Sequence, residues 1–144
     1  MPYRDTTTGL KFEEDTIIVD NNSIELSKHA LYRYLKEHNI DWQQLISKKI
    51  LPDQAFFNKE TKSFMVYEKK SQEKEGSADE KLQTCDFKLK QFKKIGAAIG
   101  ATNVSYTYIL NDWFKQPKYK DVLDYIRSID GCDYIFREDL NAIK

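Results

Sequence analysis

The chain has 144 residues, enough for one domain with a sizeable core and too few for two independent ones. Basic and acidic residues number 23 each, so the formal net charge is zero, and nucleic-acid binding must come from a local patch rather than from a field around the whole molecule. This balance counts against a protein that coats nucleic acid non-specifically.

Cysteine usage and hydropathy predict a location. The two cysteines, Cys85 and Cys132, lack the spacing of paired metal ligands, and the amino terminus lacks the apolar segment of a secretory signal. No apolar run approaches the roughly 20 residues that a membrane helix needs. We therefore expect a cytoplasmic protein with no membrane partner.

The amino-terminal part, residues 1–49, is expected to be mainly helical. Residues 16–19 suit a short strand, and apolar positions recur at helical spacing over residues 27–38 with Ser27 as a candidate N-cap. A second short helix is expected after Asp41. Together these elements predict a helical layer that precedes the core.

Two apolar runs then flank a turn-forming segment, residues 58–62, and predict a β-hairpin. A turn centred on this segment places Asp53 opposite Glu68, with their Cβ atoms roughly 4.5–5.5 Å apart on one face. Strand alternation brings Lys70 to the same face. The rest of the hairpin is apolar on both faces, so a polar trio at its end requires an explanation.

The segment after the hairpin predicts alternating helices and strands. Ser77 and Glu80 form a capping box before an amphipathic helix over residues 78–95. A strand is expected over residues 102–110, followed by a helix that Pro117 begins, and a last edge strand is expected over residues 133–136. The chain should therefore be an α/β domain with a mixed central β-sheet flanked by helices.

Two carboxylates and an amine around one point suit phosphodiester hydrolysis. Asp53 and Glu68 would hold Mg²⁺, with Mn²⁺ as a substitute, because oxygen-only ligands suit a hard octahedral cation. Lys70 would orient or help deprotonate the attacking water and stabilise the charge growing on phosphorus. The alternative interpretation is a cross-strand salt-bridge cluster at a hairpin end.

Pro52-Asp53 and Glu68-Lys69-Lys70 resemble the signature of the PD-(D/E)XK nuclease superfamily. An acid two residues before a lysine is a weak motif, because it recurs at Glu60/Lys62, Asp79/Lys81 and Asp86/Lys88. Only the pair at Glu68 ends an apolar strand that follows a second such run with Pro-Asp and precedes an amphipathic helix. The resemblance implies a restriction-endonuclease-like core and cleavage that leaves a 5′-phosphate and a 3′-hydroxyl.

The stretch Glu-Lys-Lys-Ser-Gln from Glu68, continued by residues 76–84, also resembles small type II restriction endonucleases. This similarity covers about residues 50–140, so it implies a single nuclease domain over residues 1–144 with its catalytic core at 50–140. The expected substrate is double-stranded DNA. A homodimer is expected, because matching half-sites mirror the symmetry of two subunits.

Further residues are candidates around the trio. Gln72 continues the face of Lys70, where a solvated strand end is an equal explanation. A carboxylate from the amino-terminal part, as in many superfamily members, would be Glu14, although nothing local distinguishes it from its acidic neighbours. The helix after the hairpin offers DNA contacts, or simply a solvated face, through Lys81, Gln83 and Lys88.

Two other functions fit the same residues. A structure-selective nuclease, such as a junction resolvase or a repair nuclease, would share the catalytic trio. A non-catalytic DNA-binding subunit with the same fold would have no chemical reason to keep all three residues.

Overall fold

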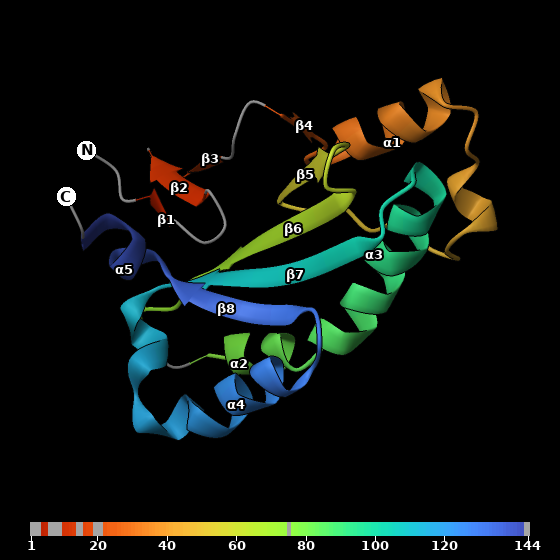
Figure 1. The fold of residues 1–144 in the computed structure, drawn as a ribbon. Helices are drawn as coiled ribbons and strands as arrows, with labels where there is room; N and C mark the ends of the chain where they lie inside the picture. Colours follow the sequence, from red (N-terminus) through yellow and green to blue (C-terminus); the bar gives the residue numbers. More distant parts are fainter. Residues whose placement is uncertain (1–3, 6–9, 14–15, 19–21, 75, 143–144) are drawn as a thin grey trace.

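The computed structural model describes residues 4–5, 10–13, 16–18, 22–74 and 76–142. Glu14 lies outside these residues. The centre of the structure is a five-stranded mixed β-sheet with strand order β4-β5-β6-β7-β8 (Figure 1). The strands are β4 (Ser23–Glu25), β5 (Gln54–Asn58), β6 (Ser63–Lys70), β7 (Asn103–Leu110) and β8 (Cys132–Phe136). Strands β4, β5 and β6 are antiparallel, whereas β6, β7 and β8 are parallel.

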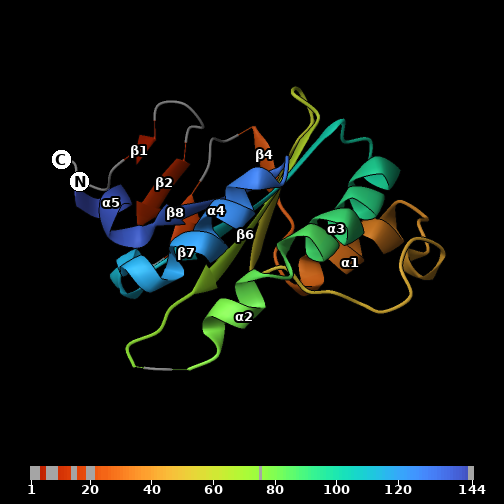
Figure 2. The same ribbon diagram turned by 90° about the horizontal axis from the view of Figure 1, so that it is seen from below.

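Helices connect the parallel strands. The α-helices are α1 (His29–Glu37), α2 (Ala78–Leu82), α3 (Cys85–Ile99), α4 (Lys120–Ser128) and α5 (Arg137–Ala142), and the 3₁₀ helices are η1 (Trp42–Gln44), η2 (Asp112–Lys115) and η3 (Pro117–Tyr119). Helices α2 and α3 carry the chain from β6 to β7, and α4 carries it from β7 to β8. Figure 2 shows α2, α3 and α4 in front of the sheet, on one of its faces. The domain is therefore α/β, as the sequence predicts.

The core lies between this face and the helices. Phe92 of α3 stacks on Tyr106 of β7 with ring centroids 5.8 Å apart, and it meets Phe64 of β6 edge-on at 6.2 Å. A Cβ atom at Gly96 would lie 2.6 Å from the side chain of Val104, so only glycine lets α3 approach β7 this closely. The apolar stripe of α3 thus fixes the helix on the sheet.

The opposite face of the sheet is also apolar. Phe56, Tyr67 and Ile109 are 4%, 5% and 2% exposed, which confirms that the hairpin is buried on both sides. A small antiparallel sheet of β1 (Arg4–Asp5), β2 (Leu10–Glu13) and β3 (Thr16–Ile18) lies on the side away from α2 and α4 (Figure 1), and α5 contacts β2.

The hairpin register is the one predicted from the sequence. Gln54 pairs with Tyr67 and Ala55 with Val66 in antiparallel β5–β6, and extending the ladder by one residue sets Asp53 opposite Glu68. The expected edge strand is also confirmed, because β8 ends the sheet.

The prediction of one continuous helix over residues 78–95 is wrong, because α2 ends at Leu82 and α3 begins at Cys85. Thr84 Oγ1 donates to the carbonyl of Lys81 at 2.7 Å, a local side-chain bond that competes with helix continuation. Ser77 occupies the N-cap position of α2 without a side-chain capping bond.

The segment 1–49 also differs from the mainly helical layer expected. Its described residues form α1 and η1, but also four strands, and β4 pairs with β5 in the central sheet. Ser27 does not cap α1, because its hydroxyl donates to Glu25 at 2.7 Å and accepts from the Ala55 amide at 3.2 Å. Within the described ranges, no helix combines the length and apolar character needed to cross a bilayer.

Candidate active site

The predicted trio lies at one edge of the central sheet. Strands β6, β7 and β8 run parallel and end in register at Lys70, Leu110 and Phe136. Strand β5 runs the other way, so it begins at this edge, directly after Asp53. Ligands of open α/β sheets bind outside the carboxyl ends of the strands, which makes this edge the expected position for a site.

Backbone contacts hold Asp53 at the edge. Its Oδ2 accepts a hydrogen bond from the Lys69 amide at 3.0 Å, and the carbonyl of the preceding Pro52 accepts from the Lys28 amide at 2.8 Å. The Tyr32 hydroxyl accepts from the Ile50 amide at 2.9 Å and donates to the Ile50 carbonyl at 2.5 Å. Helix α1 and its preceding residue therefore fix the chain that leads into Asp53.

Glu68 is a buried acid, 8% exposed. Burial, then the charge of Asp53, raises its pKa from 4.5 to about 7, and a hydrogen bond with Asp53 acts in the same direction. Its Oε2 is buried without a hydrogen-bond partner among the described residues. A buried carboxylate oxygen that lacks a partner, beside a second carboxylate, has the chemistry of a position for a divalent cation.

Two lysines act on Glu68. Lys70 follows it on the same face of β6, and Lys88 reaches it from α3; the positive charge of each lowers the pKa of Glu68, against the larger effect of burial. Both side chains are half-buried. Lys88, predicted as a DNA contact, is therefore placed close to the acid pair.

The loop after β6 is joined to the end of β7. The Gln72 amide donates to Asn111 Oδ1 at 3.2 Å, and Asn111 Nδ2 donates to the Gln72 carbonyl at 2.7 Å. A small cavity of about 130 Å³ opens at the same strand ends, lined by Lys70, Asn111 and Arg137 among others. Gln72 therefore lies in the loop after β6 at this edge, and basic side chains line the cavity at the strand ends.

Lys81 and Gln83 are exposed near the end of α2. The Lys81 carbonyl accepts from the Tyr108 hydroxyl at 3.3 Å, and Tyr108 pairs with Glu68 in the parallel ladder, so this end of α2 lies beside the site. Lys81 and Lys88 do not share the face of one continuous helix, because the expected helix is interrupted between α2 and α3.

Sequence reasoning missed Tyr106 as a neighbour of the acids. Its hydroxyl is buried without a partner in the described part of the chain, and its pKa is raised by burial and next by the charge of Glu68. Alternation along the strand puts Tyr106 on the same face as Glu68 once β6 and β7 are known to pair. That pairing is a long-range feature for which the sequence holds no direct signal.

The donor set limits what the edge can bind. Among the described residues, no three or more histidine, cysteine, aspartate or glutamate side chains come together in a metal-binding group. Asp53 and Glu68 alone would leave most of an Mg²⁺ shell to water and substrate, which is how Mg²⁺ is commonly held at phosphate-processing sites.

Comparison with protein-family models, with curated proteins and with solved structures gave no match. The function must therefore be inferred from the edge of the sheet itself.

Proposed function

We propose that this chain is a Mg²⁺-dependent endonuclease that hydrolyses phosphodiester bonds in duplex DNA, a type II restriction endonuclease with a restriction-endonuclease-like core. The supporting observation is the buried Glu68 carboxyl group, with one oxygen unpaired, beside Asp53 and two lysines. Asp53 and Glu68 hold the cation, and Lys70 acts on the substrate.

A plain salt-bridge cluster explains the geometry less well. Within the described part of the chain, no salt bridge joins Lys70 to Asp53 or Glu68, although both carboxyl groups lie at its strand end. The charge of Asp53 raises the pKa of Glu68, and the Lys70 ammonium forms no ion pair with either acid. The two carboxyl groups therefore lack a positive partner between them among the described residues. In a structural salt-bridge cluster, we expect the amine to contact the carboxylates directly.

Each residue has a defined task. Bound at the acid pair, Mg²⁺ would supply positive charge where negative charge grows on the phosphate. Asp53 keeps its orientation through the Lys69 amide, and its carboxylate joins that of Glu68 in holding the cation. Lys70 orients the attacking water and stabilises the developing charge with a pre-aimed ammonium. Lys88 adds positive charge on the helix side.

The expected assembly follows from the substrate. One active site cuts one strand, so a symmetric duplex site requires two copies of the chain, and a homodimer supplies them. The charge balance of the whole chain is zero, so the DNA contacts must come from local basic surfaces such as the one at the strand ends.

The proposal is tested by incubating the purified chain with plasmid DNA and Mg²⁺ beside Asp53→Ala and Lys70→Ala. Glu60→Gln is the matched control, because Glu60 and Lys62 repeat the acid-x-lysine spacing at the exposed turn of the same hairpin. Discrete fragments from the parent and the control alone support a restriction enzyme. Cutting confined to branched DNA supports a structure-selective nuclease instead. If no form of DNA is cut in a Mg²⁺-dependent way, the proposal that this chain is an enzyme is overturned.

A further inference from the structure

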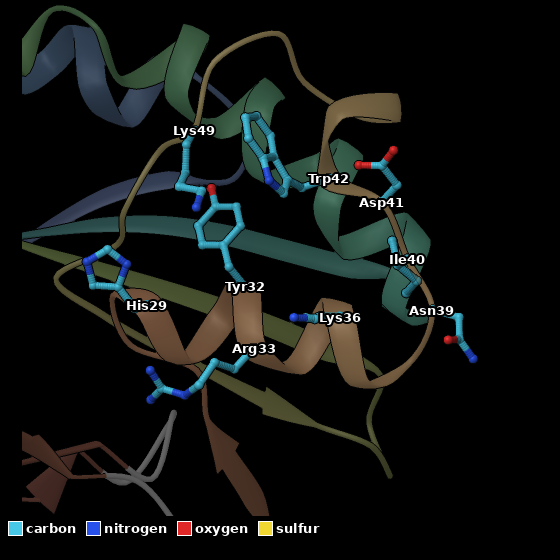
Figure 3. A pocket seen from close by; sticks show the side chains of 9 residues that line it. All are labelled: His29, Tyr32, Arg33, Lys36, Asn39, Ile40, Asp41, Trp42 and Lys49. Atoms are coloured by element: carbon cyan, nitrogen blue, oxygen red, sulfur yellow. The ribbon is translucent and has the colours of Figure 1, made fainter.

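A second hollow, of about 600 Å³, lies beside α1 and η1, away from the strand ends (Figure 3). Its size is within the range of roughly 300–1,000 Å³ typical of small-molecule sites. It shares no lining residue with the trio at the strand ends. Its lining includes an aromatic group and a basic group.

Tyr32 and Trp42 form the aromatic group. Their rings meet edge-on with centroids 5.9 Å apart, and the Lys49 ammonium lies 4.8 Å and 5.4 Å from the two ring centroids. Lys49 stands on one side of the rings and Ile40 on the other (Figure 3). Tyr32 is buried and its hydroxyl is bonded to Ile50, so this wall is held in place before any ligand arrives.

Arg33 and Lys36 form the basic group. Both project from α1 and are exposed, and neither has an ion-pair partner among the residues that the structure describes. The one acid of the lining, Asp41, lies across the hollow from Arg33 (Figure 3) and accepts the Gln43 amide at 3.0 Å as the cap of η1. Two exposed cations without ion-pair partners among the described residues thus lie on α1 beside the aromatic wall.

An aromatic wall beside unpaired cations matches a ligand that is planar at one end and anionic at the other. We propose that this pocket, formed by α1, η1 and Lys49, binds an unpaired nucleotide of the DNA strand. The base lies against Tyr32, Trp42 and Ile40, and the phosphate lies on Arg33 and Lys36. Aromatic platforms beside basic residues bind unstacked bases with little sequence preference. This inference rests on the proposed function, because DNA supplies the strand.

The pocket is linked to the acid pair through the chain. Tyr32 holds Ile50, and only three residues lie between Lys49 and Asp53, so the Cα atoms of these two residues lie at most about 14 Å apart. The Lys49 side of the pocket is therefore near enough to the acid pair for one DNA strand to contact both. A base can enter the hollow only after it has left the stack.

Tryptophan fluorescence tests the proposal without any cleavage. The chain has two tryptophans, and Trp113→Phe leaves Trp42 as the only one. This protein is titrated, without Mg²⁺, with a duplex that carries one bulged nucleotide, with the fully paired duplex of the same sequence, with a deoxynucleoside monophosphate and with inorganic phosphate. We expect the bulged duplex to quench Trp42 fluorescence and to bind at least tenfold more tightly than the other three.

Exposed side chains provide variants that should keep the fold. Arg33→Ala combined with Lys36→Ala should weaken binding of the bulged duplex at least tenfold, and the slope of log affinity against log salt should fall by about 1 to 2 because two phosphate contacts are lost. Lys48→Ala is the control for the loss of a positive charge close to the pocket, since Lys48 is exposed, adjacent to Lys49 and outside the lining. It should leave binding unchanged.

Several results would overturn the pocket. They are equal affinities for the double variant and Lys48→Ala, unchanged Trp42 fluorescence, or a free monophosphate or inorganic phosphate that binds as tightly as the bulged duplex. Quenching that persists in a protein unable to cut DNA with Mg²⁺ would overturn the nuclease and leave the pocket. Cutting of DNA without quenching of Trp42 fluorescence would overturn the pocket and leave the nuclease.

Discussion

Glu68 faces a second carboxyl group, that of Asp53, at the point where β5 begins and β6 ends. Burial and the neighbouring charge raise the pKa of Glu68 to about 7, so near neutral pH the metal-free protein holds this acid partly protonated. In the unfolded chain the same group titrates near its ordinary value of 4.5. The folded state therefore binds the proton more tightly than the unfolded state does.

Glu68→Gln should change the pH dependence of stability. Because the pKa of Glu68 is raised in the folded state, its protonated carboxyl group contributes fully to the free energy of unfolding below about pH 4.5. This contribution, at most about 3 kcal/mol, is lost as the pH rises to about 7. Glutamine cannot ionise, so the variant should gain stability relative to the parent across this window and stay ahead above it. Urea unfolding in EDTA at pH 5 to 8 measures the difference, and a difference that does not vary with pH contradicts the assignment.

Mg²⁺ should offset the free-energy cost of ionising the buried Glu68 in the folded state. A cation that binds the folded acid pair and not the unfolded chain stabilises the fold, by about 2.7 kcal/mol at a hundredfold excess over Kd. At pH 8 the Tm of the parent should therefore rise with Mg²⁺. The Tm values of Asp53→Asn and Glu68→Gln should not respond, while Glu60→Gln at the exposed turn should respond as the parent does. An equal rise in all four proteins would place the cation elsewhere.

Lys70→Met should lower kcat far more than it raises KM. The methionine keeps the stem of the side chain and removes the charge that acts on the transition state, a loss worth about 10²- to 10³-fold in kcat for one pre-aimed donor. Cleavage of a short duplex under saturating Mg²⁺ gives both constants. Lys59→Met, at the exposed turn of the same hairpin, should match the parent. A change confined to KM would make Lys70 a DNA-binding residue only.

The hairpin and its polar end were predictable because the information is local. The turn segment fixes the register, and period-two alternation then assigns Asp53, Glu68 and Lys70 to one face. The edge strand β8 and the strand β7 follow from composition and alternation for the same reason. No interaction between distant segments was needed for these predictions.

Features that depend on distant contacts were not predictable. At the break between α2 and α3, the Lys81 carbonyl accepts from the nearby Thr84 hydroxyl and also from the Tyr108 hydroxyl, which lies on a strand more than twenty residues away. The same holds for Tyr106 beneath the acids and for the pocket beside α1, where helix spacing aligns Arg33 and Lys36 but gives no sign of Trp42 or Lys49 opposite. The pattern of side chains along a segment shows which residues share a face of a helix or strand, but it does not show which distant residues that face contacts.

Tyr32→Phe should loosen the acid pair from a distance. Its hydroxyl both accepts from the Ile50 amide and donates to the Ile50 carbonyl, and the phenylalanine leaves those two half-buried groups unpaired at a cost of about 1–3 kcal/mol. Because Ile50 leads directly into Asp53, the Mg²⁺-induced rise in Tm should shrink as well as the stability itself.

Tyr34→Phe separates this effect from a general loss of a hydroxyl group on α1. Tyr34 stacks on His38 at 4.1 Å, and its hydroxyl makes no hydrogen bond to the described residues, so its removal should change stability by no more than about 0.5 kcal/mol and leave the Mg²⁺ response intact. Urea unfolding and the Tm shift with Mg²⁺ are measured for both variants. Equal losses in the two would show that the hydroxyl of Tyr32 has no positioning role, and a destabilised Tyr32→Phe with a full Mg²⁺ response would limit that role to the fold.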